Sequence, residues 1–358
     1  MNTSSFNFDK KGLILGSVAA ACALALPRSH PLRLAMSAGA ALGLGSALLK
    51  PSVNDTQNDT TDEAAPERVE SADIGGIVMR WEAHGDTGPD SIPVILIHGV
   101  PTQPRLWRYV IPHIDRGGVR CLAWEQVGFG WSMDQGLERD ISPARQADYL
   151  YDWLQHLGIA KAVFVGHDLG GGVIQQLLVK HPELSLGLVL VDSVAYDNWP
   201  VPSVRLARSQ AARIEGLKPA WLKPLFLSGI YNLGHDNDAR REESAALHWK
   251  PYDREMGPKL FAHQLRHLEV GDTVSLAGRL ATIPGPKQVV WGEADSIPLA
   301  SGQRLAEELN APLTVIPGGR HFNPEDHPVL VAQAISEVVE QVRKQQGNPL
   351  IVEGAELG

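Results

Sequence analysis

The sequence predicts an α/β fold: a mostly parallel central sheet flanked by helices, with a helical cap inserted before the last two strands. From Ile74 onward, short runs rich in β-branched residues alternate with amphipathic stretches, which is the pattern of a parallel sheet covered by helices. The alternation stops once, over residues 195–275, where helix-like segments contain six prolines and no good strand run. Such an insertion is typical of a lid over the strand ends, where α/β sheets bind ligands.

The expected strands are short, and several are apolar on both faces, as buried parallel strands must be. They cover residues 77–81, 93–98, 119–124, 162–167, 186–191, 287–291 and 313–316. Amphipathic stretches between them predict helices over about 103–115, 142–157, 169–181, 299–310 and 326–345.

Residues 1–50 form a basic, apolar leader with a net charge of +4 (five basic residues against one acid). Its two uncharged runs, residues 12–26 and 34–49, each fall short of the roughly 20 residues of a spanning helix. Three interpretations stay open: a membrane anchor or helical hairpin, a secretory signal cleaved after Ala23-Leu24-Ala25, and a transit peptide. We therefore expect membrane association through residues 12–49, or a secreted or periplasmic protein if the leader is cleaved.

The remaining boundaries follow from composition. Residues 51–73 carry seven acids against one arginine and no aromatic residue, which predicts a flexible linker. We expect a core of residues 74–194 and 276–346, interrupted by the cap and followed by a tail over residues 347–358. The chain's net charge of −9 disfavours a nucleic-acid partner, and its two cysteines are too few for a disulfide framework.

The sharpest local signal is a strand that runs into a glycine-rich helix start, Gly166-His167-Asp168-Leu169-Gly170. It has the spacing of a nucleophile elbow, in which small residues two positions before and after the nucleophile allow a tight, strained turn. The nucleophile position is Asp168, and the chain contains no G-x-S-x-G that would supply a serine. The structural alternative is a plain tight turn with Asp168 as a helix cap.

Other strand ends supply companions for Asp168. The strand before His98-Gly99-Val100-Pro101 ends beside the elbow in such a sheet, so the backbone N–H groups of Val100 and Leu169 can form an oxyanion hole. Farther along, one strand is followed by Asp295 and the next by His321. The order nucleophile, acid, histidine predicts a catalytic triad of Asp168, Asp295 and His321.

Two nearby residues leave alternatives open. Asp192 ends the strand before the cap and is the alternative acid for the hydrogen bond to His321. His167 precedes the nucleophile, so its side chain is expected to point away from the pocket and to support the turn.

At these motifs the chain resembles the α/β-hydrolase fold superfamily, and within it the aspartate-nucleophile group of haloalkane dehalogenases and epoxide hydrolases. The resemblance covers residues 74–345, and the cap matches only in position and composition. HGVPTQPRLWRYVIPHI, residues 98–114, looks most like the dehalogenase pattern, and its HGVP also satisfies the H-G-x-P of epoxide hydrolases. GHDLGG and GGRHFNPEDHP are similar to both families.

An aspartate nucleophile restricts the substrate. Attack by a carboxylate on an acyl carbon gives an anhydride, whereas attack on a saturated carbon with a leaving group gives an ester that water can cleave. The expected reaction is hydrolysis of a small apolar organic substrate with an electrophilic sp³ carbon, in which His321 activates water in the second step. This chemistry requires no metal and no organic cofactor.

The leaving group distinguishes the two families that the chain resembles. Dehalogenases surround the halide with N–H donors from a Trp after the nucleophile and an Asn or second Trp elsewhere, whereas this chain has Leu169 and Val100 at two such positions. Epoxide hydrolases use cap tyrosines. Epoxide hydrolysis is therefore the leading hypothesis and haloalkane dehalogenation the alternative, with Tyr231, Tyr252 and Trp199 as candidate donors from the cap. A further alternative is a non-catalytic member that binds a ligand or protein, although the complete triad argues against it.

Overall fold

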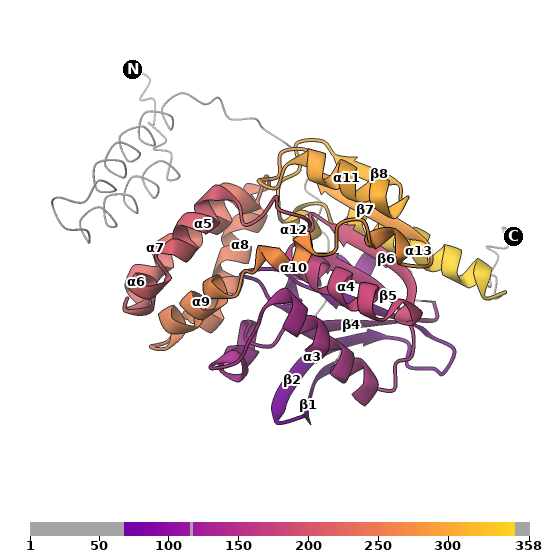
Figure 1. Cartoon of the computed structure of the whole chain (residues 1–358), viewed down its shortest axis with the longest axis horizontal. Helices are drawn as coiled ribbons and strands as arrows, with labels where there is room; N and C mark the ends of the chain where they lie inside the picture. The colour runs from indigo at the N-terminus through magenta and orange to yellow at the C-terminus, as the bar shows by residue number, and fades with distance from the viewer. Residues whose placement is uncertain (1–67, 115–116, 348–358) are drawn as a thin grey trace, which may run out of the picture.

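One eight-stranded sheet organises the computed structural model, which describes residues 68–114 and 117–347 (Figure 1). Its strands are β1 (Arg68–Ile74), β2 (Ile77–Gly85), β3 (Ile92–Ile97), β4 (Val119–Glu125), β5 (Ala162–His167), β6 (Ser185–Val191), β7 (Lys287–Gly292) and β8 (Leu313–Ile316). They lie in the order β1-β2-β4-β3-β5-β6-β7-β8. The pairs β1/β2 and β2/β4 are antiparallel, and the others are parallel. The predicted fold class is confirmed.

The linker predicted over residues 51–73 is wrong for its last six residues, which belong to β1. This edge strand pairs with β2 through a two-residue turn at Gly75 and Gly76, whose φ angles of +62° and +79° suit a tight hairpin. Its acidic residues are compatible with a strand because β1 buries no residue fully. The described fold therefore begins at Arg68, and residues 51–67 lie outside the described part.

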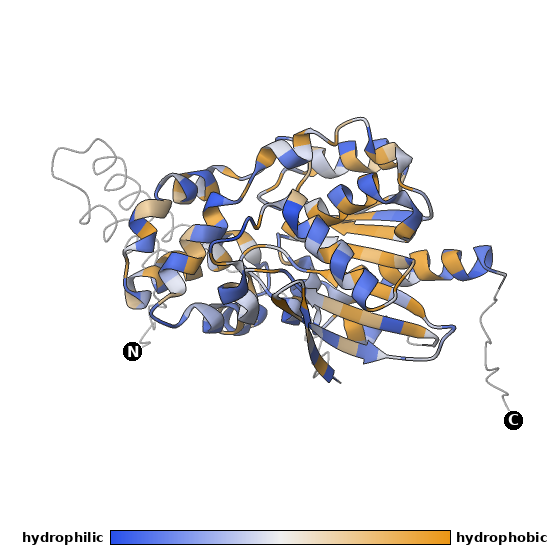
Figure 2. Cartoon of the chain, turned by 60° about the horizontal axis from the view of Figure 1, so that its bottom comes forward, coloured by the Kyte–Doolittle hydropathy of each residue, from blue (hydrophilic) through white to orange (hydrophobic). Residues whose placement is uncertain are grey.

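Helices cover both faces of the sheet. The helices α3 (Pro143–His156), α4 (Leu169–Lys180) and α11 (Leu299–Leu309) contribute to one buried core, and α13 (Pro328–Gln345) contributes to the other. Alternate residues of β3 enter the two cores, as the side-chain period of a strand requires. Figure 2 shows the resulting hydrophobic central strands and mixed helices.

The helix expected over about 103–115 is absent from its described part. Two 3₁₀ turns, η1 (Pro104–Trp107) and η2 (Ile111–His113), replace it. Pro112 lacks the N–H that a continuous helix would need at that position, so the proline breaks the predicted helix. Leu106, Trp107 and Ile111 nevertheless remain buried against the sheet.

The cap lies between β6 and β7, and α5 to α9 are grouped at one end of the molecule (Figure 1, left). Its helices are α5 (Pro202–Ser209), α6 (Ala211–Glu215), α7 (Pro219–Gly229), α8 (Asp238–Trp249), α9 (Gly257–Arg266) and α10 (Val270–Val274). A π-helical turn, η5 (Ile230–Gly234), joins α7 to α8, and a 3₁₀ turn, η6 (Lys250–Tyr252), follows α8.

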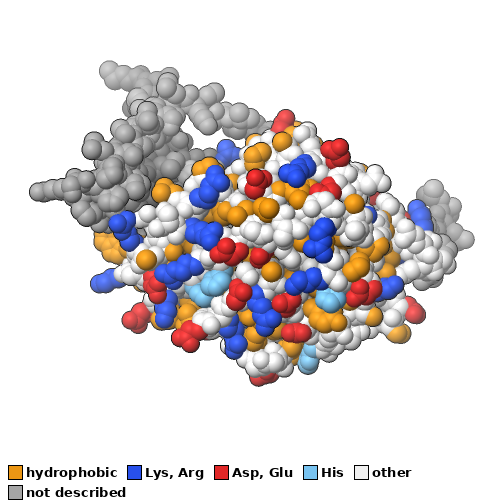
Figure 3. All heavy atoms as spheres, in the orientation of Figure 1, with side chains coloured by type: hydrophobic (Ala, Val, Ile, Leu, Met, Phe, Trp, Pro, Cys, Tyr) orange, Lys and Arg blue, Asp and Glu red, His pale blue; other side chains and the backbone are white. Residues whose placement is uncertain are grey.

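Within the described residues, every helix is too short or too polar to cross a membrane. The segment predicted to associate with membranes, residues 12–49, lies outside this part, as does the tail from residue 348 onward. On the face that Figure 3 shows, basic and acidic side chains are interspersed.

Candidate active site

Asp168 occupies a strained turn between β5 and α4. Its φ and ψ angles are 50° and −122°, and positive φ is uncommon for a residue with a side chain. Neighbouring backbone atoms lie so close to this turn that positions 166 and 170 have no room for a side chain. A Cβ atom on Gly166 would lie 2.6 Å from the Cα of Gly171, and one on Gly170 would lie 2.5 Å from the His98 carbonyl oxygen. The elbow predicted from the sequence is therefore present, with Asp168 at its tip.

The two backbone donors predicted for the oxyanion hole lie beside Asp168. The Val100 N–H donates to Asp168 Oδ2 over 2.9 Å, and the Leu169 N–H also donates to this carboxylate. The chain can approach so closely because residue 99 is glycine, where a Cβ would lie 2.5 Å from Oδ2. The Asp168 carboxylate thus accepts from N–H groups that follow two neighbouring strands, β3 and β5.

His321 joins Asp168 to Asp295. Its Nε2 lies 3.7 Å from Asp168 Oδ1, and its Nδ1 lies 3.1 Å and 3.0 Å from the two oxygens of Asp295. The Ile297 N–H donates to Asp295 Oδ1 over 3.0 Å and helps to hold the acid in place. The three residues predicted as a triad are therefore brought together from the ends of β5, β7 and β8.

The charged groups of the triad shift one another's pKa values. Burial alone would lower the pKa of His321, but the carboxylates of Asp295, Asp168 and Asp192 raise it to about 10. Burial raises the pKa of Asp168, although His321 and the two backbone N–H groups oppose the rise. Burial acts in the same direction on Asp295, yet the adjacent imidazole lowers the pKa of this acid below its ordinary value. The arrangement favours an ion pair between Asp295 and His321.

Asp192 lies next to the triad without a hydrogen bond to His321 among the contacts of the described residues. The Gly292 N–H donates to Asp192 Oδ1 over 2.7 Å, and Asn323 Nδ2 donates to Oδ2 over 2.6 Å. Asp295, and not the alternative acid Asp192, therefore makes the hydrogen bond to His321.

His167 contacts the loop that carries His321, whereas its position before the nucleophile predicted a side chain that supports the turn. Its Nε2–H donates to the His321 carbonyl oxygen over 2.7 Å, and burial lowers the pKa of His167 to about 3. The imidazole is therefore neutral. Sequence reasoning did not single out Phe322 or Asn323, which follow His321, although both lie in the quoted motif GGRHFNPEDHP. Phe322 packs against His167 and His321 with ring centroids 5.9 Å and 5.6 Å apart.

The three candidate donors from the cap have other hydrogen-bond partners. Tyr252 donates to Gln264 over 2.8 Å, Tyr231 donates to Glu242 over 2.9 Å, and the Trp199 indole N–H donates to Thr273 over 2.7 Å. In the described part of the chain, no hydrogen bond or ring contact links these side chains to the triad. A sequence pattern identifies residue types in a cap but not the direction in which each side chain packs, so these assignments required the structure.

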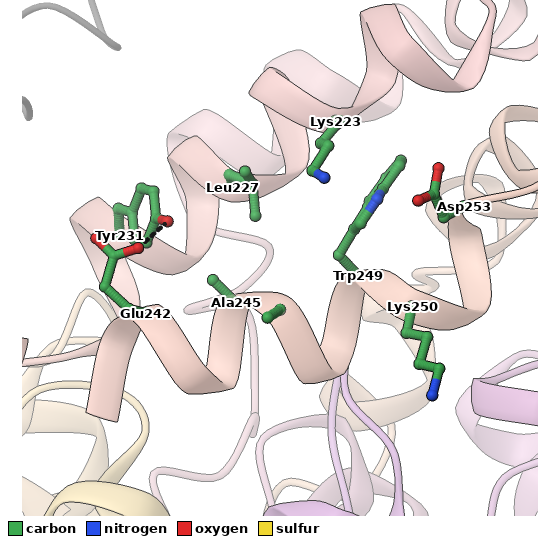
Figure 4. Close-up of a pocket in the computed structure, with 9 residues that line it drawn as sticks. Lys223, Leu227, Tyr231, Glu242, Ala245, Trp249, Lys250 and Asp253 are labelled. Atoms are coloured by element: carbon green, nitrogen blue, oxygen red, sulfur yellow. Dashed lines mark hydrogen bonds between the residues drawn. The ribbon is translucent and has the colours of Figure 1, made fainter. Parts of the chain in front are cut away.

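Tyr231 faces a separate pocket between α7 and α8, with a volume of about 350 Å³ (Figure 4). The Tyr231 hydroxyl points to Glu242 at one end, and Trp249 stands between Lys223 and Asp253 at the other. No triad residue lines this pocket. Tyr252 lies elsewhere, in a buried aromatic cluster with Phe226, Trp249 and Phe261.

A buried network of charged and polar side chains joins the cap to the loop that carries His321. Glu325 pairs with Arg108 from the core, and both side chains are fully buried. From the cap, His248 Nε2 lies 3.1 Å from Glu325 Oε1, and His235 Nδ1 lies 2.8 Å from Asp326 Oδ1. Despite these acids and histidines, no group within residues 68–114 and 117–347 is arranged to hold a metal ion.

The chain belongs to the α/β hydrolase fold family, whose model matches residues 92–328. An uncharacterised hydrolase, YugF, of Bacillus subtilis is 26% identical over 269 residues, which cover 74% of this chain and 96% of the relative. Haloalkane dehalogenase 2 of Mycobacterium bovis is 25% identical over 264 residues, or 70% of this chain and 88% of the relative.

Solved structures share the fold at low identity. An α/β hydrolase fold protein from Burkholderia ambifaria superposes with a TM-score of 0.69 at 23% identity, covering 77% of this chain and 99% of the other. The epoxide hydrolase CorEH superposes with a TM-score of 0.57 at 18% identity, covering 76% of this chain and 98% of the other. The chain is thus a member of the α/β hydrolase fold family, with a haloalkane dehalogenase among its sequence relatives and an epoxide hydrolase among the solved structures that share its fold.

Proposed function

We propose that the protein is a hydrolase that uses Asp168 as a nucleophile and forms a covalent alkyl ester. The observation that carries this proposal is the setting of the Asp168 carboxylate, which accepts from the N–H groups of Val100 (at Oδ2) and Leu169 and places Oδ1 3.7 Å from His321 Nε2. Oδ1 attacks an electrophilic sp³ carbon of a small apolar substrate. A new C–O bond forms while the bond to the leaving group breaks and its electron pair departs with that group.

Water cleaves the ester in the second step. His321 Nε2 takes a proton from water as the oxygen attacks the Asp168 carboxyl carbon, and the N–H groups of Val100 and Leu169 stabilise the oxyanion. Alkylation removes the negative charge of Asp168, one of the charges that raise the pKa of His321 to about 10 in the free protein. The pKa of the imidazole therefore falls when the base is needed.

The reaction is tested by mass spectrometry of the Asp168 peptide. We expect a single turnover in ¹⁸O-labelled water, with a panel of epoxides and haloalkanes, to place label in Asp168. The His321→Gln variant should instead accumulate the alkylated peptide, because the ester forms but is not hydrolysed. Asp168→Asn is the matched control for both readouts. A substrate that the wild type converts without label or adduct at Asp168 contradicts the covalent route.

Epoxides are the substrate class that we propose first. Leu169 and Val100 offer no side-chain N–H to a departing halide, whereas a tyrosine hydroxyl such as that of Tyr252 carries its proton at neutral pH. We take Tyr252 as the candidate acid for the epoxide oxygen. Its partner Gln264 also donates to the Gly128 carbonyl oxygen of the core over 2.7 Å, so this part of the cap contacts the loop after β4.

Haloalkane dehalogenation is the second proposal. It is favoured by the 98–114 motif and by the dehalogenase relatives. Dehalogenation predicts that a halide ion is released while the alkyl ester forms on Asp168.

We also propose that residues 12–49 associate with a membrane. The support is the pair of apolar runs flanked by basic residues. Separation of membrane and soluble fractions, with sequencing of the mature N-terminus, tests this proposal. A retained leader in the membrane fraction indicates an anchor, and a shortened soluble protein indicates a cleaved signal. A soluble protein that begins at Met1 contradicts both.

A further inference from the structure

Asp192 connects the loop of the acid to the loop of the histidine. It follows β6, is fully buried and has a positive φ of 44°. Its Oδ1 accepts from the N–H of Gly292, three residues before Asp295, and its Oδ2 accepts from the side chain of Asn323, two residues after His321. Asn323 Nδ2 also donates to the Arg320 carbonyl oxygen over 2.6 Å. A single carboxyl group therefore fixes both strand ends that supply the acid and the base.

Asp192 is also in contact with the carboxyl group of Asp295. The groups that face Asp192 are this acid, the His321 imidazole, the Gly292 N–H and the Asn323 amide. The imidazole is the one group among these that can carry positive charge, and its Nδ1 is bonded to Asp295. Two buried carboxylates in contact cannot both remain ionised without a cation for each. One proton must therefore reside on this pair.

The proton belongs on Asp192. Burial and the neighbouring Asp295 raise the pKa of Asp192 well above its ordinary value, whereas His321 overcomes the effect of burial on Asp295 and lowers its pKa. A neutral Asp192 can donate its hydroxyl hydrogen to Asp295 while its oxygens accept from Gly292 and Asn323. All partners of this buried group are then satisfied.

We propose that Asp192 is a positioning residue that stays protonated at neutral pH and donates a hydrogen bond to the Asp295 carboxylate. It keeps Asp295 in place and leaves a single negative charge opposite His321. The protonation of Asp192 is independent of the substrate, but its effect on turnover rests on the proposed function.

The protonation is tested on the full-length protein by infrared spectroscopy at pH 7. The carbonyl-stretch band of protonated carboxyl groups should contain an Asp192 component that is lost in Asp192→Asn, beside a component from Glu125, whose pKa burial raises to about 7. Asp168→Asn is the matched control, because burial also raises the pKa of Asp168, and it should retain the Asp192 band. An unchanged band in Asp192→Asn overturns the inference. If this variant does not fold, ¹³C NMR of labelled aspartates in the wild type gives the same answer, since all side chains ionised at pH 7 would overturn it.

The effect on turnover is measured in the second step. An asparagine can still donate to Asp295, whereas a leucine cannot, so Asp192→Leu should slow ester hydrolysis by on the order of ten- to a hundredfold more than Asp192→Asn. Formation of the ester should change little in either variant, because Asp192 does not touch Asp168. Equal rates of hydrolysis in the two variants contradict the positioning role. A lack of any ester at Asp168 in the wild type contradicts the proposed function instead and leaves the infrared result unaffected.

Discussion

The two oxygens of the Asp168 carboxylate have different partners, and this difference assigns them different parts in the proposed reaction. Oδ2 accepts from the Val100 N–H, so it is the oxygen on which negative charge develops when water attacks the ester. Oδ1 lies on the His321 side, 3.7 Å from Nε2, so the alkyl group transferred to Oδ1 is near the base. The strained turn at residue 168 sets both positions.

The glycines of the elbow provide a prediction at the scale of one residue. Gly170→Ala places a methyl group against the carbonyl oxygens of Ile97 and His98, which are backbone atoms and cannot move aside. We expect a loss of about 1–3 kcal/mol in the free energy of unfolding, measured with denaturant, together with a displaced Asp168.

The matched control for this change is Gly229→Ala at the end of α7. The added methyl meets nothing within 4 Å, and φ is −61°, which alanine adopts freely. This variant should be about 0.4–1 kcal/mol more stable, because alanine restricts the unfolded chain. Equal stability of the two variants would show that the elbow is not tightly packed.

The proposed epoxide acid provides a second prediction for single side chains. Tyr252→Phe removes the hydroxyl that donates to Gln264. If Tyr252 is the acid, we expect this variant to open epoxides about 10²-fold more slowly or worse. Tyr231→Phe is the control, since its hydroxyl is bonded to Glu242 at the separate pocket. The measurement is the rate of ester formation with an epoxide and with a haloalkane. Similar rates for the two variants exclude Tyr252 as the acid.

The cap is joined to the core by a buried ionic network, and this attachment is a property of whole elements. Arg108 follows η1, Glu325 lies in α12 (Asn323–Asp326), and His248 lies in α8. Burial would raise the pKa of Glu325, but Arg108 and His248 keep it well below the ordinary value, so this acid is ionised. Glu325 is four residues beyond His321, so the network also restrains the loop of the base.

Removal of one charge from this network should be costly. Glu325→Gln removes the fully buried ionised partner of Arg108 and leaves only the partly exposed Glu243, and loss of a buried partner typically costs about 3–5 kcal/mol. Glu243→Gln is the control, because Glu243 also pairs with Arg108 at 2.9 Å but is 42% exposed, and it should cost about 1 kcal/mol or less. Denaturant unfolding measures both losses, and hydrogen exchange of α8 should accelerate in Glu325→Gln alone. Comparable losses in the two variants would contradict a role for burial.

The sequence predicted those elements whose signal is local. The elbow, the acid and the histidine were found because each follows an apolar strand within a few residues, and parallel strands bring their ends to one edge. The strand β1 was missed because its acids resemble a linker, although Gly75-Gly76 is a recognised hairpin signal. The ionic network was missed because Arg108, His248 and Glu325 are distant in the sequence and meet only after the cap has packed.

At the scale of the whole molecule, the charge cluster around His321 links folding to pH. The folded chain holds the pKa of His321 at about 10, whereas an exposed histidine has a value of about 6.5. The folded state therefore binds this proton more tightly than the unfolded state. The contribution of the charged His321 to the free energy of unfolding is complete below about pH 6.5 and disappears as the pH rises through about 10.

Comparison of the wild type with His321→Gln between pH 6 and pH 10 measures this contribution. We expect the difference in the free energy of unfolding to be largest near pH 6 and to shrink continuously toward pH 10. In an Asp295→Asn background the same comparison should depend much less on pH, because Asp295 is the strongest of the charges that raise the pKa of His321. A difference that stays constant over this range would mean that His321 is not charged in the folded protein, and the ion pair with Asp295 would then have to be abandoned.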